Sequence, residues 1–218
     1  MKNVIIFGAN DFGRLIKYYF ENDNDPRKIL AFTVDKEYLN NSLFCGLPVI
    51  DFDEISNLFS KDDIEILIAI GNKEMNNIRK RVFQKCHNMG YAIASFIHSS
   101  CSLNNAKIGE GNIILESCLL YPYSTIGNGN LLWDHVLISH DCIVGDFNTF
   151  SSYSDLCGYV KVGDNCFFGK HSVVNEYVSI NNYTLVGADA YVKNNTNEYD
   201  VVVPQRSITL NKKSIDLM

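Results

Sequence analysis

The sequence predicts a small α/β domain with a parallel sheet, followed by a parallel β-helix. Two observations predict this. Short apolar runs alternate with amphipathic stretches over the first hundred residues, and an apolar residue then recurs at every sixth position from residue 108 to residue 192. A chain of 218 residues fits one large domain or two small ones. We therefore expect domains over residues 1–100 and 101–197, with a tail over residues 198–218.

The α/β domain is predicted from four apolar runs and the amphipathic stretches between them. The expected strands are Val4–Phe7, Ile29–Val34, Ile64–Ile70 and Ala92–Ile97. The expected helices span residues 12–20, a short stretch through residue 59 that Asp51 caps, and residues 72–89. Because strands and helices alternate, we expect a small parallel sheet with right-handed crossovers.

The β-helix is predicted from a repeat of six residues that begins at Ile108. All fifteen residues at this spacing are aliphatic or Phe: Ile108, Ile114, Leu120, Ile126, Leu132, Ile138, Val144, Phe150, Leu156, Val162, Phe168, Val174, Ile180, Val186 and Val192. Six residues make one short strand and one corner, and three such units make a triangular coil. The fifteen units predict about five coils, each rising about 4.8 Å over the last.

Two further positions of the repeat predict how each coil is built. The residue four positions after the aliphatic one is mostly small or polar, so we expect it inside the coil near a turn. Glycine follows the aliphatic residue at Gly109, Gly127, Gly145 and Gly163, where we expect the corner to need an unusual backbone conformation.

Composition and charge exclude several classes of function. A net charge of −6 argues against a nucleic-acid partner. No apolar run approaches the roughly 18 residues that a membrane span needs, and the apolar stretch at the N-terminus is too short for a signal peptide. The chain has seven cysteines and no CxxC spacing, which fits free thiols in a reducing compartment. We therefore expect a cytoplasmic protein without a membrane partner.

Five motifs together resemble a known family. They lie at residues 7–13 (FGANDFG), 34–35 (VD), 69–72 (AIGN), 138–146 (ISHDCIVGD) and 203–206 (VPQR). On these motifs the chain resembles the NeuD/PglD-type sugar acetyltransferases, in which a Rossmann-like domain precedes a left-handed β-helix of hexapeptide repeats. The resemblance implies a homotrimer of bacterial surface-glycan biosynthesis. It further implies an acetyl-CoA-dependent N-acetyltransferase for a nucleotide-linked amino-deoxy sugar, and we favour a 4-amino-4,6-dideoxy sugar.

By this resemblance the first domain binds the nucleotide of the sugar substrate. The residues expected to line that site are Gly8, Ala9, Asn10, Asp35, Gly71 and Asn72. A glycine turn before a helix lets backbone N–H groups approach a phosphate. The family loop usually reads GAGGHG and this chain has GANDFG, so an alternative interpretation is that Gly8 and Gly13 only form a turn. A redox dinucleotide site needs GxGxxG, and position 10 is Asn, so we expect no NAD.

The resemblance also places the catalytic residues. His140 matches the general base, and an imidazole suits the removal of a proton from an amine or hydroxyl that attacks a thioester. Asp141, where the family usually has Glu, is expected to orient the imidazole. Gly158 follows one coil later, and its N–H is expected to bind the oxyanion. His140 stands two residues past the inward Ile138, so we expect it at an outward corner where neighbouring subunits meet.

The resemblance places acetyl-CoA, the one expected co-substrate, in a groove between two β-helices. The residues expected beside it are Gly158, Ala188, Pro204 and Arg206. Trp133, the only tryptophan, stands where PglD-like proteins carry Asn near the sugar. Two interpretations of Trp133 stay open: it packs at a subunit contact, or it stacks on the apolar face of a deoxysugar.

Three alternatives compete with this interpretation. His135 and His140 are spaced like a histidine pair of gamma-class carbonic anhydrases, but a zinc enzyme needs three ligands and no histidine lies between His98 and His135. We therefore expect no metal. A sialic acid or CMP-sialic acid O-acetyltransferase stays open, as does a non-catalytic scaffold that binds nucleotide sugars. The sequence determines neither the sugar nor its nucleotide, so a UDP-, GDP- or dTDP-linked substrate fits equally well.

Overall fold

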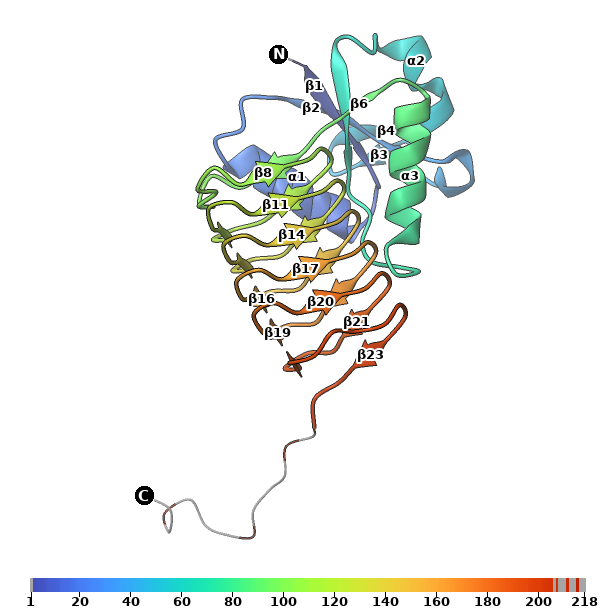
Figure 1. Cartoon of the computed structure of the whole chain (residues 1–218). Coiled ribbons are helices and arrows are strands. Elements are labelled where there is room, and N and C mark those ends of the chain that lie inside the picture. The colour runs from blue at the N-terminus through green and yellow to red at the C-terminus, as the bar shows by residue number, and fades with distance from the viewer. Residues whose placement is uncertain (1, 206, 208–210, 212–214, 216–218) are drawn as a thin grey trace.

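The computed structural model of the chain describes residues 2–205, 207, 211 and 215. An α/β domain lies at one end, and a parallel β-helix extends away from it in stacked coils (Figure 1). In the described part of the chain, no helix is both long and apolar enough to cross a membrane.

The α/β domain is built on a six-stranded mixed sheet. Its strands run in the order β3-β4-β2-β1-β5-β6 and are β1 (Asn3–Phe7), β2 (Ile29–Val34), β3 (Leu43–Phe44), β4 (Leu47–Asp51), β5 (Ile64–Ile68) and β6 (Ala92–Ile93). All pairs are parallel except β3 with β4. The prediction of a parallel sheet therefore missed the antiparallel strand β3 at its edge. Cys45 and Gly46, both at positive φ, form a tight turn that adds an antiparallel edge strand too short for an apolar pattern.

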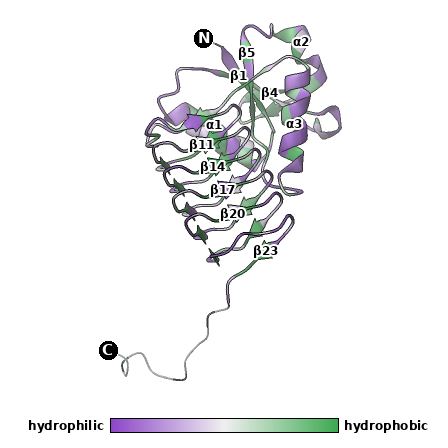
Figure 2. Ribbon diagram, viewed as in Figure 1, coloured by the Kyte–Doolittle hydropathy of each residue, from purple (hydrophilic) through white to green (hydrophobic). Residues whose placement is uncertain are grey.

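Three α-helices flank this sheet: α1 (Asp11–Asn22), α2 (Ile55–Leu58) and α3 (Asn77–Asn88). Two single turns, η1 (Lys36–Tyr38) and η2 (Phe52–Glu54), accompany them, and the Asp51 carboxylate accepts from the Asp53 N–H at the start of η2. Helix α3 begins five residues later than predicted, because residues 74–76 take positive φ. Hydrophilic and hydrophobic residues alternate along α3 (Figure 2), as expected for a helix with one buried face.

The predicted strand Ala92–Ile97 is in fact two strands. β6 ends the sheet of the α/β domain, whereas β7 (Phe96–Ile97) pairs with the first coil of the β-helix. Ser95 lies between them, where its carbonyl accepts from Arg27 and its hydroxyl accepts from the Asn112 N–H. The chain thus passes from one architecture to the other inside a single apolar run.

Three parallel sheets form the faces of the β-helix. The first face contains β10 (Leu119–Leu120), β13 (Leu137–Ile138), β16 (Asp155–Leu156), β19 (Val173–Val174) and β22 (Tyr191–Val192). The second contains β8 (Lys107–Ile108), β11 (Thr125–Ile126), β14 (Ile143–Val144), β17 (Lys161–Val162) and β20 (Ser179–Ile180). The third contains β7, β9 (Ile113–Ile114), β12 (Leu131–Leu132), β15 (Thr149–Phe150), β18 (Phe167–Phe168), β21 (Leu185–Val186) and β23 (Val201–Val202).

Three kinds of corner connect these faces. Going along the chain, the first corner joins the third face to the first, as at residues 133–136. The second corner joins the first face to the second, as at residues 139–142, and the third corner joins the second face to the third, as at residues 145–148. Paired residues in adjacent coils are eighteen apart, such as Leu119 and Leu137.

The interior of the β-helix confirms the predicted repeat. Every period-six side chain from Ile114 to Val192 is buried, and Ile108 is partly buried against the same core. Phe150 and Phe168 stack in neighbouring coils with their ring centres 4.5 Å apart. The small residues four positions on are buried as well, among them Cys118, Ser124, Cys142 and Ser154.

The glycines of the repeat have a different role from the predicted one. Positive φ recurs every six residues, but two positions later, at Gly111 and Gly129 and at residues such as Tyr123 and Asp141. Gly109, Gly127 and Gly145 are instead required because the next coil packs too close to them for a side chain. A Cβ at any of these three would lie 2.7 Å from the carbonyl oxygen of the glycine in the next coil.

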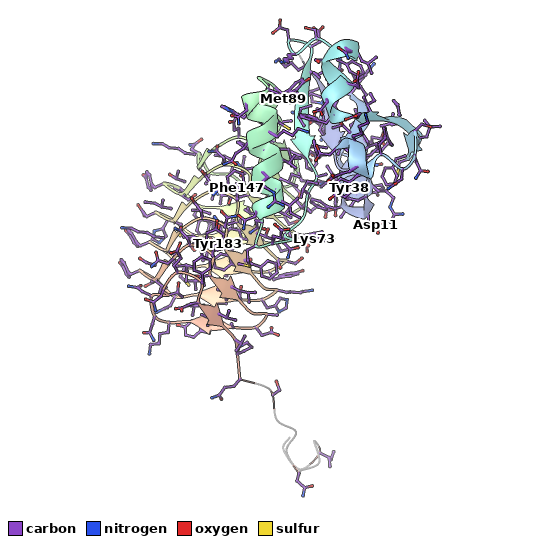
Figure 3. The ribbon with its side chains drawn as sticks, turned by 90° about the vertical axis from the view of Figure 1, so that its right-hand side faces the viewer. Asp11, Tyr38, Lys73, Met89, Phe147 and Tyr183 are labelled. Atoms are coloured by element: carbon purple, nitrogen blue, oxygen red, sulfur yellow. The ribbon has the colours of Figure 1, made fainter. Side chains whose placement is uncertain are left out.

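A buried arginine joins helix α3 to the β-helix. The Arg79 guanidinium donates to the carbonyl oxygens of Gly71 (2.9 Å), Gly129 (2.8 Å) and Asn148 (3.0 Å), and to the Thr149 hydroxyl (3.1 Å). Burial lowers the pKa of Arg79 to about 9, so at neutral pH it stays charged among carbonyl dipoles. Phe147 of the third corner packs edge-on against Phe83 of α3, and Figure 3 shows it beside that helix.

Candidate active site

His140, Asp141 and Gly158 meet at the second corner of the β-helix. The Nδ1 atom of His140 lies 2.9 Å from Oδ2 of Asp141, so the shorter acidic residue reaches the imidazole. The His140 side chain is 48% exposed, which leaves its other nitrogen open to a ligand. Asp141 takes φ +58°, and this left-handed corner brings its carboxylate back toward the preceding residue.

Gly158 lies directly under the His140 ring. A Cβ at this position would be 2.8 Å from Cε1 and 2.9 Å from Nε2 of His140, so only glycine leaves the ring where it is. Within the described residues, no acceptor is paired with the Gly158 N–H, whereas its carbonyl accepts from the Tyr177 N–H. The corner therefore combines an imidazole, a carboxylate that holds it and a backbone N–H for which residues 2–205 supply no acceptor.

A cavity of about 490 Å³ lies between the α/β domain and the third face of the β-helix. Its lining includes Gly71, Asn72 and Trp133, three of the predicted substrate residues. The remaining lining residues are Asp11, Phe12, Leu15, Leu131, Thr149, Ser151 and Phe167. The half-buried Trp133 packs against Phe12 of α1, with ring centres 5.6 Å apart, and also borders the cavity.

Sequence reasoning missed most of this lining. Phe12 and Leu15 follow the glycine loop in the first turns of α1, and that proximity was a usable signal. Thr149 and Phe167 lie on the third face of the β-helix, and Ser151 lies at the first corner that follows it. Their part in the cavity depends on how the two architectures pack, which no local pattern encodes.

The glycine loop is shaped by close packing as well as by any ligand. Gly8 has φ +126°, and a Cβ there would lie 2.6 Å from the Ala69 carbonyl oxygen. A Cβ at Gly13 would overlap the Gly8 carbonyl. The Asn10 side chain accepts from the Gly13 N–H at 2.9 Å and caps α1, and Ala9 packs against the domain core. Close packing therefore explains why both positions are glycine, and the Asn10 amide oxygen already accepts a hydrogen bond from within the chain.

Asp35 lies outside the residues that line this cavity, and its carboxylate is already paired. Lys85 of α3 lies 2.6 Å from Asp35 and 3.2 Å from Asp53. Burial alone would lower the pKa of Lys85, but its hydrogen bonds to the two carboxylates raise that pKa overall. Lys85 is a charged neighbour of the predicted nucleotide site that sequence reasoning missed, since it lies fifty residues further along the chain.

Of the residues predicted beside the coenzyme, Gly158 lies under His140, whereas Ala188 and Pro204 lie away from it within one chain. Ala188 is exposed at the first corner. Pro204 is also exposed, and its Cδ lies 3.6 Å from the position of a Cβ at Gly187, so Pro204 and Ala188 are close in space. Arg206 lies outside the described residues. Gly158 is at the second corner, with the first face between it and Ala188.

A second hollow, of about 600 Å³, borders the corner that holds His140. It is lined by Asn104, Asn105, Lys107, Pro122, Tyr123, Ser124 and Thr125. The Pro122 carbonyl accepts from the Asp141 N–H at 3.3 Å, so this hollow adjoins the His140 corner on the side of the α/β domain. Its polar lining was not predicted.

The two histidines weighed as metal ligands lie on different corners. His135, at the first corner, contacts Asp134 at 3.2 Å and stacks on Tyr153, whereas His140 is at the second corner. In the described part of the chain, no three His, Cys, Asp or Glu side chains are grouped so that they would hold a metal ion.

One known family model matches the first part of the chain. Residues 3–86 match the family model of the PglD N-terminal domain, which confirms the predicted resemblance over this segment. No curated protein matches the sequence.

Solved structures match nearly the whole chain. One is the acetyltransferase domain of PglB from Neisseria gonorrhoeae FA1090, with TM-score 0.81 and 18% identity over 94% of this chain and 97% of that one. Another is a histidine-to-alanine variant of GDP-perosamine N-acetyl transferase from Caulobacter crescentus with CoA and GDP-perosamine, with TM-score 0.83 and 21% identity over 94% of each chain. WeeI from Acinetobacter baumannii AYE has TM-score 0.72 and 22% identity over 94% of this chain and 97% of that one. At these identities the likeness establishes the fold.

Proposed function

We propose that this chain is an acetyl-CoA-dependent N-acetyltransferase that acts on a nucleotide-linked amino-deoxy sugar in bacterial surface-glycan biosynthesis. The observation that carries the proposal is the geometry at the second corner, where Asp141 holds the His140 ring and Gly158 lies beneath it. The likeness in fold to a GDP-perosamine N-acetyl transferase supports a 4-amino-4,6-dideoxy sugar as the acceptor.

His140 acts as the general base in this proposal. While the Nδ1–H of His140 donates a hydrogen bond to the Asp141 carboxylate, the lone pair on Nε2 accepts a proton from the sugar amine as the amine nitrogen attacks the thioester carbon. The negative charge on the carbonyl oxygen is then stabilised by the Gly158 N–H, which no described residue engages. Loss of one such donor typically raises the barrier by about 3 kcal/mol. As the adduct collapses, the C–S bond breaks and the CoA thiolate leaves with the proton that Nε2 of His140 had accepted, so the products are the N-acetylated sugar and free CoA thiol.

The complete site requires a second copy of the chain. The second corner is the edge of the triangular prism that lies opposite the third face, and the cavity with Gly71, Asn72 and Trp133 is on that third face. One chain therefore cannot bring His140 to its own cavity. We propose a homotrimer of left-handed β-helices, each with about five coils, in which His140 of one copy approaches the cavity of the next.

The substrates occupy different parts of this composite site. The nucleotide of the sugar lies near the glycine loop Gly8–Asn10 and Gly71, with the Asp35–Lys85 pair at the same end of the sheet. Trp133 and Asn72 border the sugar. Acetyl-CoA lies in the groove between two β-helices, beside Ala188 and Pro204; we also assign it Arg206, which is outside the described residues. The exposure of Ala188 and Pro204 supports this placement.

Release of thiol from acetyl-CoA tests the proposal. The acceptors are UDP-, GDP- and dTDP-linked 4-amino and 3-amino deoxysugars, sialic acid and CMP-sialic acid. We expect release with one amino sugar, with an acetyl mass gain on the product. The His140→Ala variant should lower turnover about 10²- to 10⁴-fold. Release with sialic acid alone would instead assign O-acetylation, and no release with any acceptor would favour a nucleotide-sugar-binding scaffold.

A further inference from the structure

An aromatic pair stands beside His140 that the proposed reaction leaves without a role. The ring of Tyr159 meets the His140 ring nearly at right angles (87°), with the ring centres 5.2 Å apart. Tyr177, one coil further, stacks on Tyr159 at 4.9 Å with the two planes 7° from parallel. Both tyrosines are at the second corner and are partly exposed, by 43% and 69%.

The contact with Tyr159 involves backbone and side chain together. The Tyr159 N–H donates to the His140 carbonyl at 3.1 Å, which fixes the two corners relative to each other. The charge of Asp141 raises the pKa of the Tyr159 hydroxyl, as expected if the ring is close to the carboxylate that holds His140. The imidazole is thus bordered by Asp141 at Nδ1, by Gly158 beneath and by the Tyr159 ring.

Tyrosine recurs at this position of the β-helix, although the backbone conformation there suits asparagine better. Tyr159 has φ +61° and Tyr177 has φ +63°, a conformation that asparagine adopts more readily than tyrosine. Asn165 occupies the equivalent corner position at φ +60° elsewhere in the same β-helix. Tyrosine also occupies this position at the first and third corners, as Tyr153 and Tyr183, so the backbone conformation alone assigns no role to Tyr159. The case for a role rests on the contact between the Tyr159 and His140 rings.

We infer that Tyr159 is a positioning residue for His140: its ring, supported by Tyr177, confines the imidazole to the orientation in which Asp141 holds it. The inference rests on the proposed role of His140 as the general base. His140 is exposed and has one side-chain hydrogen bond among the described residues, so without the ring it can rotate away from Gly158. Edge-to-face aromatic pairs contribute enough to bias such a rotation about 2- to 12-fold.

A double-mutant cycle tests this role. We expect Tyr159→Asn to lower kcat about 2- to 12-fold with little change in KM, and Tyr159→Phe to keep the wild-type rate because it keeps the ring. In a His140→Asn background, Tyr159→Asn should cause no further loss. An equal loss in both backgrounds would mean a general structural effect and would overturn the inference, as would a wild-type rate in Tyr159→Asn.

Tyr183→Asn is the matched control for this cycle. Tyr183 also has positive φ (+57°) and stacks on Tyr199 at 4.9 Å, but it lies at the third corner beside α3 (Figure 3). Its replacement removes a stacked tyrosine without touching His140. We expect kcat of the folded protein to stay at the wild-type value.

A second measurement does not depend on activity. In ¹³C-labelled protein, the Hε1 signal of His140 is assigned by its loss in His140→Asn. Cross-relaxation between this Hε1 proton and the Gly158 Hα protons reports whether the ring stays above Gly158. We expect it to weaken in Tyr159→Asn and to persist in Tyr159→Phe and Tyr183→Asn. If no acceptor is acetylated, the proposed function fails while this cross-relaxation still decides whether Tyr159 positions the ring; unchanged cross-relaxation in Tyr159→Asn would overturn the inference.

Discussion

Replacement of Gly158 by alanine should displace the His140 ring and lower kcat while leaving the stability of the fold unchanged. The new Cβ would lie 2.8 Å from Cε1 of the His140 ring, and ordinary contact begins at 3.4 Å, so the ring must move by about 0.6 Å. The fold can absorb this, because the contact is with the far end of a side chain and Gly158 does not take positive φ. A shift of about 1 Å in a reacting group costs about 10²-fold, so we expect kcat to fall about 10- to 100-fold.

Thiol release from acetyl-CoA measures this loss, and thermal unfolding measures the stability. The unfolding midpoint of Gly158→Ala should stay within about 2 °C of wild type. Gly109→Ala is the control, since its Cβ would meet the carbonyl oxygen of Gly127 at 2.7 Å and must displace backbone. The control should lose stability and keep kcat in its folded fraction. A Gly158→Ala enzyme with kcat within twofold of wild type would refute the reasoning, as would a stability loss like that of Gly109→Ala.

Two further predictions concern stability. Arg79→Met leaves buried carbonyls without a donor, and we expect urea unfolding to show a loss of roughly 2–4 kcal/mol; a loss below about 1 kcal/mol would contradict the role assigned to Arg79. Asp155 has one carboxylate oxygen that is buried with no partner among the described residues, and burial raises its pKa above 3.8. Because a raised folded pKa makes the charged form destabilising, stability falls as pH rises through that pKa. Asp155→Val, which matches the neighbouring Leu137 and Val173, should therefore gain about 1 kcal/mol at pH 7, or about 2–4 °C in the unfolding midpoint, and lose that gain toward pH 4.

The repeat made the β-helix predictable because each of its positions faces the same surroundings in every coil. A period-six residue always points inward, and the residue four positions on always lies inside near a turn. Fifteen repeats, each only a weak signal by itself, therefore combine into a strong prediction of the β-helix. The reason for the glycines was harder to see. Gly109 and Gly127 are close to the next coil, and a contact between residues eighteen apart leaves the same sequence signature as a corner with unusual φ.

In the α/β domain, two features escaped prediction because they depend on single residues. The β3–β4 hairpin is defined by Cys45 and Gly46, and a turn of two residues between strands this short has no periodicity to detect. The late start of α3 follows from three residues at positive φ, of which Asn76 is buried and donates to the Cys166 carbonyl. That contact spans ninety residues, so only the packed molecule shows why the helix cannot begin earlier.

The candidate site was predictable where its residues stack in register. His140 and Gly158 are eighteen residues apart, which places them in adjacent coils whatever the rest of the chain does. The cavity with Trp133 was only partly predictable, because it forms where α1 meets the third face and no repeat relates those two segments. The same reasoning supports the proposal of a composite site. Coil stacking places His140 at the edge opposite the face that the α/β domain covers, so under the proposed function a sugar bound at Trp133 would meet the imidazole of another copy.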